Sequence, residues 1–588
     1  MPKEQSQEYL NNLRHSCAHL LAASVVKLWP QAKNAIGPSI ENGFYQDFDM
    51  GGTKISEADF PRIEKTMNEI LQTWDNFQIR EVSVKQAKMD FSWNPYKLAL
   101  IDEFAGQGKT ITETKQGSFL DLCRGGHLKH PKKEIKHFKL LSVAGAYWRG
   151  SEKNQMLTRI YGTCWPSKAE LEAYLKMREE AEKRDHKKLG KELELFVFSD
   201  TVGTGLPLWT PKGSVIRREL ERFIVDEEIK RGYLHVYTPD IAKLDLYKKS
   251  GHYPYYKESM YAPIKIEEDE FMLRPMSCPH HFELYLARHH SYRELPMRIA
   301  ELVKLYRYEQ SGELSGLMRV RTFCLADAHI IARKQQAEAE ISGALDLIDF
   351  VCKTLGLKLG TDYRYRLSLG NRKDDKKYFK DDKSWDEAEA VLRKVLKKRK
   401  APFFEAENEA AFYGPKIDIQ MKNVNGKEDT AFTVQYDFVM PKRFKLSYTN
   451  ESGADEEPIV VHRSSIGAVE RIIALLIERY AGAFPVWLSP VQAAVLPISD
   501  KQVKYAQKIV DELRENDIRV DFYNRPESIG KKIREAEMQK VPYMLIVGEK
   551  EMKAKSVAVR ARGQKDLGSI KLEKFIDKIE KEIKSKSL

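Results

Sequence analysis

The sequence lacks the marks of several protein classes. Its six cysteines are scattered over 588 residues, which excludes a disulfide-stapled secreted scaffold and leaves reduced thiols or metal ligands. The N-terminus has no basic segment followed by an apolar one, and the most apolar stretch, 472–488, is interrupted by Glu478 and Arg479. The sequence also has no internal repeat. We therefore expect a soluble, cytoplasmic protein without a membrane partner.

Length and composition indicate several folded domains. A chain of 588 residues is too long for one core, and at roughly 100 to 200 residues per domain it should hold three or four. Hydrophobic residues make up 42% and charged residues 31%, an ordinary globular composition. The net charge of +12 favours a polyanionic partner such as RNA but does not establish one.

The N-terminal region is expected to form a mixed α and β domain over residues 1–166. Its first element is an amphipathic helix between residues 8 and 29 that ends before Pro30, with His15 and His19 on the face opposite the apolar positions. Those apolar positions are Leu10, Leu13, Cys17, Leu21 and Leu28. The charged segment 167–189 predicts a helix that links domains, so we assign 167–190 as a helical linker.

The remaining chain is predicted to form two domains. Strand-like runs at 297–308, 317–323, 417–421 and 430–440, with helices between them, indicate a large domain over 191–487. Strands at 493–498, 519–523 and 543–548 alternate with helices at 503–515 and 529–540, which predicts a small α/β domain over 488–588. We interpret the charged segment 371–400 as a solvated helix surface rather than an RNA contact.

Three arginines surround a loop rich in glycine and serine. Arg307 precedes the loop Ser311-Gly-Glu-Leu-Ser-Gly316, and Arg319 and Arg321 follow it. Planar guanidinium groups stabilise charge that develops on phosphate oxygens better than a flexible ammonium does. For any one of these arginines an exposed basic hairpin is the alternative. Downstream, Gly467-Ala-Val-Glu-Arg471 opens an apolar helix.

The arginine loop and the Arg471 helix resemble the second and third signature motifs of class II aminoacyl-tRNA synthetases. Further blocks narrow the resemblance to the threonyl-tRNA synthetase family, in the form that lacks an extra N-terminal domain. These blocks are Arg274-Pro-Met-Ser-Cys278, Ala326-Asp-Ala-His329, Phe412-Tyr-Gly-Pro-Lys416, Thr433-Val-Gln435 and Val460-Val-His462. The resemblance implies an α+β multidomain fold. It comprises a class II antiparallel-sheet catalytic domain, an N-terminal α+β editing domain and a C-terminal α/β anticodon-binding domain.

The resemblance implies residue roles in the activation of threonine with Mg-ATP. Arg307 would bind the α-phosphate, Glu309 would orient the adenine and Arg319 would hold the terminal phosphates. Phe323 would stack on the base, and Arg471 would meet ATP. The remaining matches are Lys416 near phosphate, Asp327, Tyr413 and Gln435 near threonine, and His252 in transfer to the tRNA(Thr) ribose.

Cys278, His329 and His462 match the family positions that hold one zinc ion per chain. Spacing alone could not find them, because they lie far apart and the chain has 14 histidines. One cysteine and two histidines leave a coordination position open, as in catalytic zinc sites. A site that demands a bound hydroxyl would reject valine, which is nearly isosteric with threonine but lacks that group.

Serine keeps the hydroxyl, so a second sieve is needed. The resemblance implies one that hydrolyses mischarged seryl-tRNA, built from His15, His19, Lys97, Cys123 and His127. A His-x-x-x-His pair with a cysteine and a further histidine is also a metal-ligand set, although the glutamate of a zinc-protease helix is absent. The sequence leaves open whether this site uses a metal.

Two further features follow from the resemblance. The helix 214–231 and the strand ending in Thr238-Pro239 would form a homodimer interface. Asn524, Glu549, Arg560 and Arg562 are candidates for reading the unpaired anticodon bases. The alternatives are a non-catalytic paralogue that binds tRNA or mRNA and regulates, and a class II synthetase for another amino acid such as proline or serine.

Overall fold

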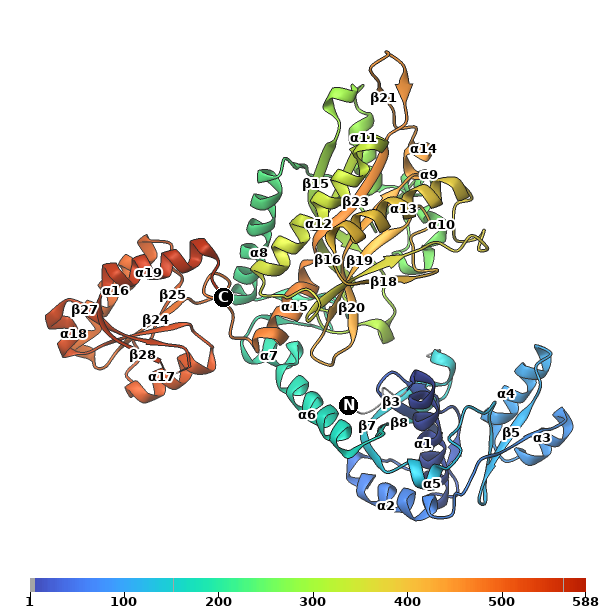
Figure 1. Ribbon diagram of the computed structural model, residues 1–588. Coiled ribbons are helices and arrows are strands. Elements are labelled where there is room, and N and C mark those ends of the chain that lie inside the picture. Colours follow the sequence, from blue (N-terminus) through green and yellow to red (C-terminus); the bar gives the residue numbers. More distant parts are fainter. Residues whose placement is uncertain (1–5, 152, 564) are drawn as a thin grey trace. The chain divides into compact units, whose positions relative to one another are not determined.

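The computed structural model describes residues 6–151, 153–563 and 565–588 (Figure 1). The chain divides into two compact units, Met1–Glu179 and Glu180–Leu588. No helix within the described ranges combines the length and the apolar character that a bilayer crossing needs.

Unit 1 is built on one antiparallel sheet and a long helix. The sheet order is β1 (Lys33–Asn34), β3 (Gly43–Asp49), β8 (Met156–Trp165) and β7 (His137–Tyr147), with β2 (Ser39–Ile40) paired to β3. Helix α1 (Gln7–Leu28) shares the core of this sheet with α2 (Phe60–Leu71). The Ser6 side chain accepts a hydrogen bond from the Tyr9 backbone N–H, which fixes where α1 begins.

The predicted N-terminal helix is confirmed, but its expected polar face is wrong. Between residues 13 and 25, a stretch described throughout, His15 alone is not buried. The histidine face is covered because the rings of Phe77, Phe119 and His127 pack around His19.

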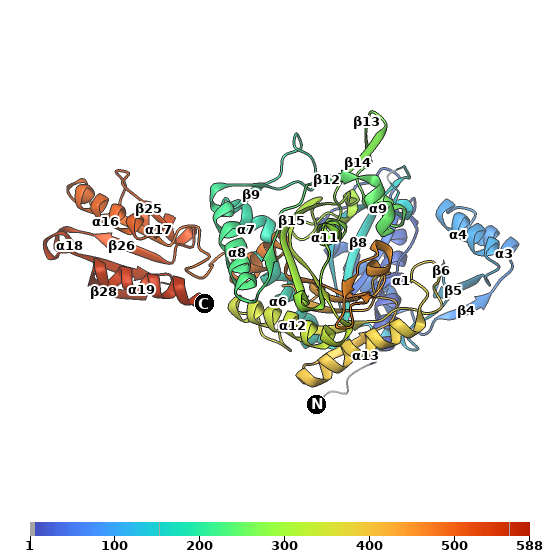
Figure 2. The same ribbon diagram turned by 90° about the horizontal axis from the view of Figure 1, so that it is seen from above.

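A second layer of unit 1 carries two short helices. The sheet β4 (Gln78–Glu81), β5 (Thr112–Gln116) and β6 (Phe119–Leu122) lies beside α3 (Val84–Asp90) and α4 (Pro95–Gly106), as Figure 2 shows. The Asn94 side chain accepts hydrogen bonds from the backbone N–H groups of Tyr96 and Lys97 at the start of α4. This cap places Lys97 in the first turn of the helix.

The charged linker is two helices rather than the single run that the sequence predicts. Helix α6 (Lys168–Arg184) ends where the Asp185 side chain accepts hydrogen bonds from the backbone N–H groups of Lys187 and Lys188. An aspartate in this position starts a new helix, α7 (His186–Glu192).

The core of unit 2 is an eight-stranded sheet. Apart from the outermost pairs β11–β15 and β17–β18, its described neighbours pair antiparallel, as expected for the large domain. Its order is β11 (Leu234–His235), β15 (Met297–Tyr306), β16 (Thr322–Ala332), β23 (Ile459–Ala468), β20 (Glu428–Asp437), β19 (Lys416–Lys422), β17 (Tyr363–Ser368) and β18 (Phe403–Ala406).

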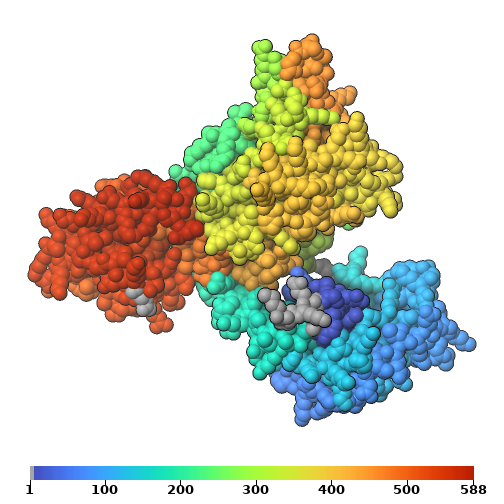
Figure 3. Space-filling model, in the orientation of Figure 1, coloured from blue at the N-terminus to red at the C-terminus, as the bar shows by residue number. Residues whose placement is uncertain are grey.

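Four helices share the main core with one face of this sheet: α8 (Pro211–Lys230), α12 (Ala337–Thr354), α13 (Asp382–Arg399) and α15 (Val469–Tyr480). Ala326, Ala328 and Ile330 of β16 belong to that core, so the alternate residues of the strand point to the opposite face. The yellow segment that contains α13 lies on the outside of the domain (Figure 3). Most of its lysines and aspartates are exposed, whereas Trp385, Leu392, Val395 and Leu396 are buried together with Glu389, in agreement with the predicted solvated helix surface.

Two predicted strand boundaries are wrong. Residues 317–321 are not a strand: 317–319 belong to a turn in which the Ser315 backbone N–H donates to the Arg319 carbonyl, and the strand begins only at Thr322. Strand β20 ends at Asp437 rather than at 440. The Asp437 carboxylate accepts hydrogen bonds from the backbone N–H groups of Val439 and Met440, which starts helix α14 (Met440–Phe444).

Smaller elements accompany the sheet: β9 (Phe196–Val197), β10 (Leu208–Trp209), α9 (Leu244–Ser250), α10 (His252–Tyr255), α11 (Cys278–Leu286), and the three-stranded sheet of β12 (Ile241–Lys243), β14 (Asp269–Leu273) and β13 (Ile264–Ile266).

The C-terminal α/β pattern is confirmed. Strands β25 (Val520–Phe522), β24 (Ala493–Pro497) and β26 (Tyr543–Val547) are parallel, and β27 (Ser556–Ala561) and β28 (Lys565–Lys571) continue the sheet antiparallel. Helices α16 (Val503–Glu515) and α19 (Leu572–Ser585) cover one face and α17 (Ile529–Met538) the other (Figure 1). Helix α18 (Glu549–Ala554) follows β26.

Candidate active site

Three central strands of unit 2 bring predicted residues to one face of the sheet. The register pairs His329 of β16 with His462 of β23, and Asp327 with Ser464. On the other side of β23, His462 pairs with Gln435 of β20. Because residues two apart on a strand share a face, these side chains line one cavity of about 500 Å³.

Cys278 completes a compact cluster with His329 and His462. The potential ligand atoms of these three buried residues all lie within 4.8 Å of one another. His462 Nε2 lies 2.7 Å from Asp437 Oδ2, and His329 Nδ1 lies 2.7 Å from His281 Nδ1. One nitrogen of each ring is therefore engaged, which leaves His329 Nε2 and His462 Nδ1 for a metal.

The chemistry of this cluster suits a metal ion. Burial lowers the pKa of His329 well below its ordinary value, and His462 and His281 act in the same direction. Neutral imidazole is the form that binds metals. Burial raises the pKa of the Cys278 thiol, and a coordinated cation opposes this because it deprotonates the thiol. The three residues fit a zinc ion with one open position.

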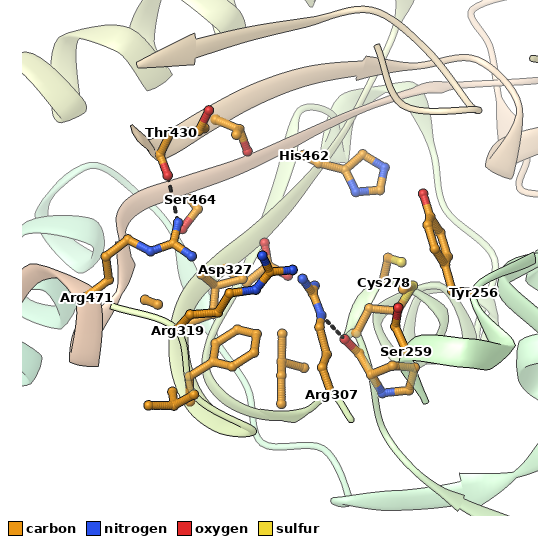
Figure 4. A pocket seen from close by; sticks show the side chains of 18 of the residues that line it. Tyr256, Ser259, Cys278, Arg307, Arg319, Asp327, Thr430, His462, Ser464 and Arg471 are labelled. Atoms are coloured by element: carbon orange, nitrogen blue, oxygen red, sulfur yellow. Dashed lines mark hydrogen bonds between the residues drawn. The ribbon is translucent and has the colours of Figure 1, made fainter. Parts of the chain in front are cut away.

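The arginines of the predicted motifs enter the same cavity from separate elements (Figure 4). Arg307 Nε donates to the Pro275 carbonyl at 3.4 Å, and the guanidinium lies 5.2 Å from the centroid of the Phe323 ring. Arg471 of α15 donates to the carbonyls of Met318 and Thr430 at 3.2 and 2.7 Å. Guanidinium groups held by backbone carbonyls give a fixed wall for an anion.

Arg319 and Glu309 lie together at this wall. Arg319 Nε is 2.9 Å from Glu309 Oε2, and both residues line the cavity with Phe323. The structure thus gathers all five residues predicted to bind ATP: Arg307, Glu309, Arg319, Phe323 and Arg471.

The residues predicted to contact threonine surround the cluster. The Tyr413 hydroxyl donates to Gln435 Oε1 at 2.6 Å, and its ring stacks on His462 with centroids 5.0 Å apart. Ser277 Oγ donates to Asp327 Oδ2 at 2.5 Å. A small polar substrate beside the cluster would meet a carboxylate, a phenol and an amide.

His252 and Lys416 have different positions. His252 lines the cavity, its Nδ1 lies 2.7 Å from Ser250 Oγ, and burial lowers its pKa to about 3. Lys416 Nζ lies 2.9 Å from the buried Asp418, and Lys416 is not among the described residues that line the cavity. The structure therefore brings His252 to the predicted site but engages Lys416 elsewhere.

Unit 1 holds a second cluster in a cavity of about 340 Å³, lined by His15, His19, Lys97 and Cys123. Cys123 Sγ lies 3.5 Å from His15 Nε2 and 3.3 Å from His127 Nε2. The ligand atoms of the three histidines and Cys123 lie within 4.8 Å of one another. All five residues predicted for this site are therefore neighbours or line its cavity.

Burial controls the charge of this second cluster. It lowers the pKa of His127 to about 2, with His19 and His15 adding to the effect, and it also lowers the pKa of His15 and His19. The positive charge is supplied instead by Lys97, whose Nζ lies 2.5 Å from Asp121 Oδ1. The site thus offers imidazoles beside an ammonium group that is paired with a carboxylate.

The four residues predicted to read the anticodon do not gather. Asn524 and Glu549 follow the carboxyl ends of the parallel strands β25 and β26. Arg560 pairs with Met544 near the opposite end of β26, and Arg562 donates to the Lys540 carbonyl at 3.0 Å. The pair Asn524 and Glu549 and the pair Arg560 and Arg562 therefore lie towards opposite ends of the strands.

Sequence reasoning missed the residues that hold these sites in place. His281 follows Cys278 by three positions, which is one helical turn, and that spacing could have revealed it. Asp437 contacts His462, and Asp121 contacts Lys97, but the members of each pair are about 25 positions apart in the sequence and meet only in the folded protein. No local signal distinguishes them from other aspartates.

Family models match three parts of the chain. Residues 261–480 match the tRNA synthetase class II core domain (G, H, P, S and T). Residues 492–582 match the anticodon binding domain, and residues 114–161 match the threonyl and alanyl tRNA synthetase second additional domain. The first match contains the arginines and most of the residues that line their cavity, and the third contains Cys123 and His127.

Curated relatives match over nearly the whole chain. The threonine–tRNA ligase of Staphylococcus carnosus is 47% identical over 583 residues, covering 99% of this chain and 89% of that protein. Threonine–tRNA ligase 1 of Bacillus subtilis is 48% identical over 584 residues, covering 99% and 90%. A crystal structure of the RNA binding domain of threonyl-tRNA synthetase from Cryptosporidium parvum is 37% identical with a TM-score of 0.64, covering 68% of this chain and 98% of that one.

Proposed function

Because the chain belongs to the threonine–tRNA ligases, a family of class II aminoacyl-tRNA synthetases, we propose that Cys278, His329 and His462 bind one zinc ion that selects threonine. The enzyme activates threonine with Mg-ATP to threonyl-adenylate, transfers it to tRNA(Thr), and proofreads mischarged seryl-tRNA through its second additional domain. When bound, the zinc would take the amino and hydroxyl groups of threonine into its coordination shell and so discriminate against valine.

The shared face of β16, β23 and β20 carries this proposal, because its register places Asp327, His329, His462 and Gln435 around one point. Asp327 accepts a hydrogen bond from the threonine hydroxyl, and Tyr413 and Gln435 position the amino acid. Fixed groups of this kind reject a substrate that leaves them unpartnered.

The arginine wall, formed by Arg307, Arg319 and Arg471, binds ATP for the attack of the threonine carboxylate on the α-phosphate, which breaks the bond to the β-phosphate and releases pyrophosphate. Arg307 stabilises the charge that develops on the α-phosphate oxygens, and Arg319 holds the terminal phosphates. Arg471 contacts ATP from α15. Glu309 orients the adenine, and Phe323 stacks on it. Lys416 is assigned to phosphate, which requires its Nζ to leave Asp418, and His252 assists transfer to the tRNA ribose.

Metal analysis combined with ATP–pyrophosphate exchange tests the zinc proposal. The native protein should contain about one zinc per chain and exchange with threonine far better than with valine. Cys278→Ser should lose both the metal and the exchange, whereas Cys352→Ala, which alters a buried thiol of α12, should keep them. A native protein without zinc, or an active Cys278→Ser, would contradict the proposal.

We also propose that hydrolysis of seryl-tRNA takes place in the cavity of unit 1. His15 Nδ1 donates to the Gly126 carbonyl at 3.2 Å, so its Nε2 carries the lone pair that faces Cys123. The neutral histidines can position a water, and Lys97 can bind the polar 3′ end of the tRNA. Deacylation measured with and without a chelator would decide whether this cluster needs a metal.

A homodimer is proposed from the edge strand β11 and the neighbouring helix α8. Apolar side chains are exposed there on the elements predicted for the first class II motif: Ile229 is 55% exposed, Leu234 57% and Tyr237 94%. An exposed apolar edge strand invites pairing with a second copy. Light scattering should give a dimer for the native protein and a monomer for Leu234→Asp.

The domain bounds and the compartment are also proposals. We assign editing, linker, catalytic and anticodon-binding segments to 1–166, 167–190, 191–487 and 488–588, and the three family matches fall inside the first, third and fourth. Asn524, Glu549, Arg560 and Arg562 are proposed to contact different nucleotides of the anticodon loop. All six cysteines lie in described parts of the chain and are free, which supports a reducing compartment, the cytoplasm.

A further inference from the structure

Helix α7 of the linker contributes a buried histidine to the loop that carries the ATP-binding arginines. His186 is 3% exposed, and its Nε2 accepts a hydrogen bond from the Leu317 backbone N–H at 3.1 Å. Leu317 is fully buried within the turn 315–319. We infer that His186 is a positioning residue that holds this turn in the conformation that binds ATP. The inference rests on the ATP-binding roles proposed for Arg319 and Arg471.

One tautomer of His186 satisfies both of its contacts. Its Nδ1 lies 2.7 Å from Glu478 Oε1, and a carboxylate can only accept, so Nδ1 carries the proton. Nε2 then holds the lone pair that receives the Leu317 N–H. Glu478 belongs to the last turn of α15, the helix that carries Arg471. A single imidazole therefore joins α7, α15 and the turn.

The turn lies so close to α7 that only glycine fits at position 316, next to the imidazole of His186. Gly316 has a φ of +51°, and a Cβ built on it would lie 2.2 Å from His186 Nε2. The Asp185 cap makes His186 the first residue of α7, so the ring cannot slip along the helix. The Asp185 cap thus fixes the position of His186, and Gly316 allows the Leu317 N–H to reach it.

The residues after Leu317 connect this contact to the arginine wall. The Met318 carbonyl accepts the hydrogen bond from Arg471 Nε, and Arg319 leaves the turn to pair with Glu309. Without His186 the Leu317 N–H would be buried without a partner, and the turn would have to move to reach water. Both arginines would move with it. The residues proposed for threonine belong to β16, β20 and the Phe412–Lys416 block, none of which is part of the turn.

Kinetics of His186 variants test this inference. For His186→Phe the KM for ATP in the exchange reaction should rise about 10- to 100-fold, while the KM for threonine and the zinc content stay near the native values. His186→Gln keeps one acceptor and one donor, so its KM for ATP should lie between that of the native enzyme and that of His186→Phe. Lys188→Ala changes an exposed residue of the same helix and serves as the matched control.

A second variant keeps the test decisive if His186→Phe does not fold. Gly316→Ala forces the His186 ring and the turn apart, so this single change should raise the KM for ATP. In the double variant Gly316→Ala with His186→Ala the clash is absent, so the rise in the KM for ATP should be smaller than the product of the rises in the two single variants. Native-like KM values for ATP in the folded variants, or equal losses for ATP and threonine, would overturn the positioning role.

Arg319→Ala separates this inference from the proposed function. If Arg319→Ala loses affinity for ATP while the His186 and Gly316 variants do not, only the role of His186 is wrong. If Arg319→Ala also binds ATP normally, the assignment of the loop to ATP fails, and the inference fails with it.

Discussion

His281 lies with its Nδ1 2.7 Å from Nδ1 of His329, and its other ring nitrogen lies 3.1 Å from a carboxylate oxygen of Glu301. Because the carboxylate can only accept, His281 donates from Nε2 and accepts at Nδ1 from His329. The lone pair of His329 is thereby placed on Nε2. Glu301 also accepts hydrogen bonds from the backbone N–H and the hydroxyl of Thr238. A chain of hydrogen bonds therefore connects His329 to the strand end that is predicted to lie at the dimer interface.

We expect His281→Ala to bind zinc about 10- to 100-fold more weakly than the native enzyme, because the partners that orient metal-ligating histidines contribute on this scale. Competition with a metal-binding dye measures the affinity directly, without relying on catalysis. His289→Ala removes an exposed histidine just after the same helix and should leave the affinity unchanged. Native affinity in His281→Ala would show that Cys278 and His462 orient the metal without this chain of contacts.

We expect Arg307→Lys to slow adenylate formation by about 100-fold or more, although the charge is kept. A planar fork held against the Pro275 carbonyl and the Phe323 ring cannot be replaced by a flexible ammonium. ATP–pyrophosphate exchange measures the loss, and Arg293→Lys, a change at an exposed arginine, is the control. Exchange at the native rate would remove Arg307 from the α-phosphate.

Elements with a clear periodicity could be predicted from the sequence. Helices α1, α15 and α16 and strands β24 and β26 follow from apolar spacing and their flanking residues. The turn 315–319 could not, because Leu317 is buried by tertiary packing and reads as a strand residue. Periodicity also cannot show that a helix is covered on both faces, as α1 is, because His19 is buried by residues from other elements.

The residues of the two candidate sites could be predicted only from the family resemblance. Cys278, His329 and His462 are brought together by strand register and a helix start, which no spacing rule supplies. The contacts of Asp437 with His462 and of His186 with Leu317 could not be predicted for the same reason, since each joins segments that are distant in sequence. The register could not be derived from the sequence because a bulge between Leu325 and Asp327 shifts the pairing of β16 with β23.

We expect unit 1 to lose stability as the pH falls below about 6.5, the ordinary pKa of an exposed histidine. Burial lowers the pKa of His127 to about 2, so above pH 6.5 neither state is protonated, and below it the unfolded state alone binds a proton. Stability therefore falls with pH throughout this window. Between pH 6.5 and 5.5 His127 alone should account for about 1 kcal/mol.

Hydrogen exchange of the backbone of α1, corrected for its intrinsic pH dependence, measures this loss. His127→Phe keeps a ring stacked on Phe77 but removes the titrating group, so its stability should depend less steeply on pH. His130→Phe changes an exposed histidine nearby and should keep the native slope. A native slope in His127→Phe would mean that this ring does not titrate on unfolding in the way its burial requires.

We expect His19→Ala and Cys123→Ala to leave threonylation largely intact while seryl-tRNA accumulates. His15 and His19 lie one turn apart on α1, and Cys123 and His127 close the cluster from the segment after β6. All of them belong to unit 1, whereas the arginine wall and the cluster of Cys278, His329 and His462, which is proposed to bind zinc, belong to unit 2. Removing a side chain proposed for editing therefore leaves the groups proposed to activate threonine unchanged.

The decisive assay supplies purified seryl-tRNA and compares its deacylation by native and variant enzymes, with threonylation measured in parallel. His130→Ala is the control, since it removes an exposed histidine of the same unit outside the cluster. A fall in both activities would indicate that the variants disturb the whole chain. Native deacylation rates in His19→Ala and Cys123→Ala would mean that this cavity binds the tRNA end without hydrolysing it. The discrimination against serine would then have to arise at the zinc cluster, where a hydroxyl-bearing substrate one methyl group smaller loses only about 1 to 3 kcal/mol of binding.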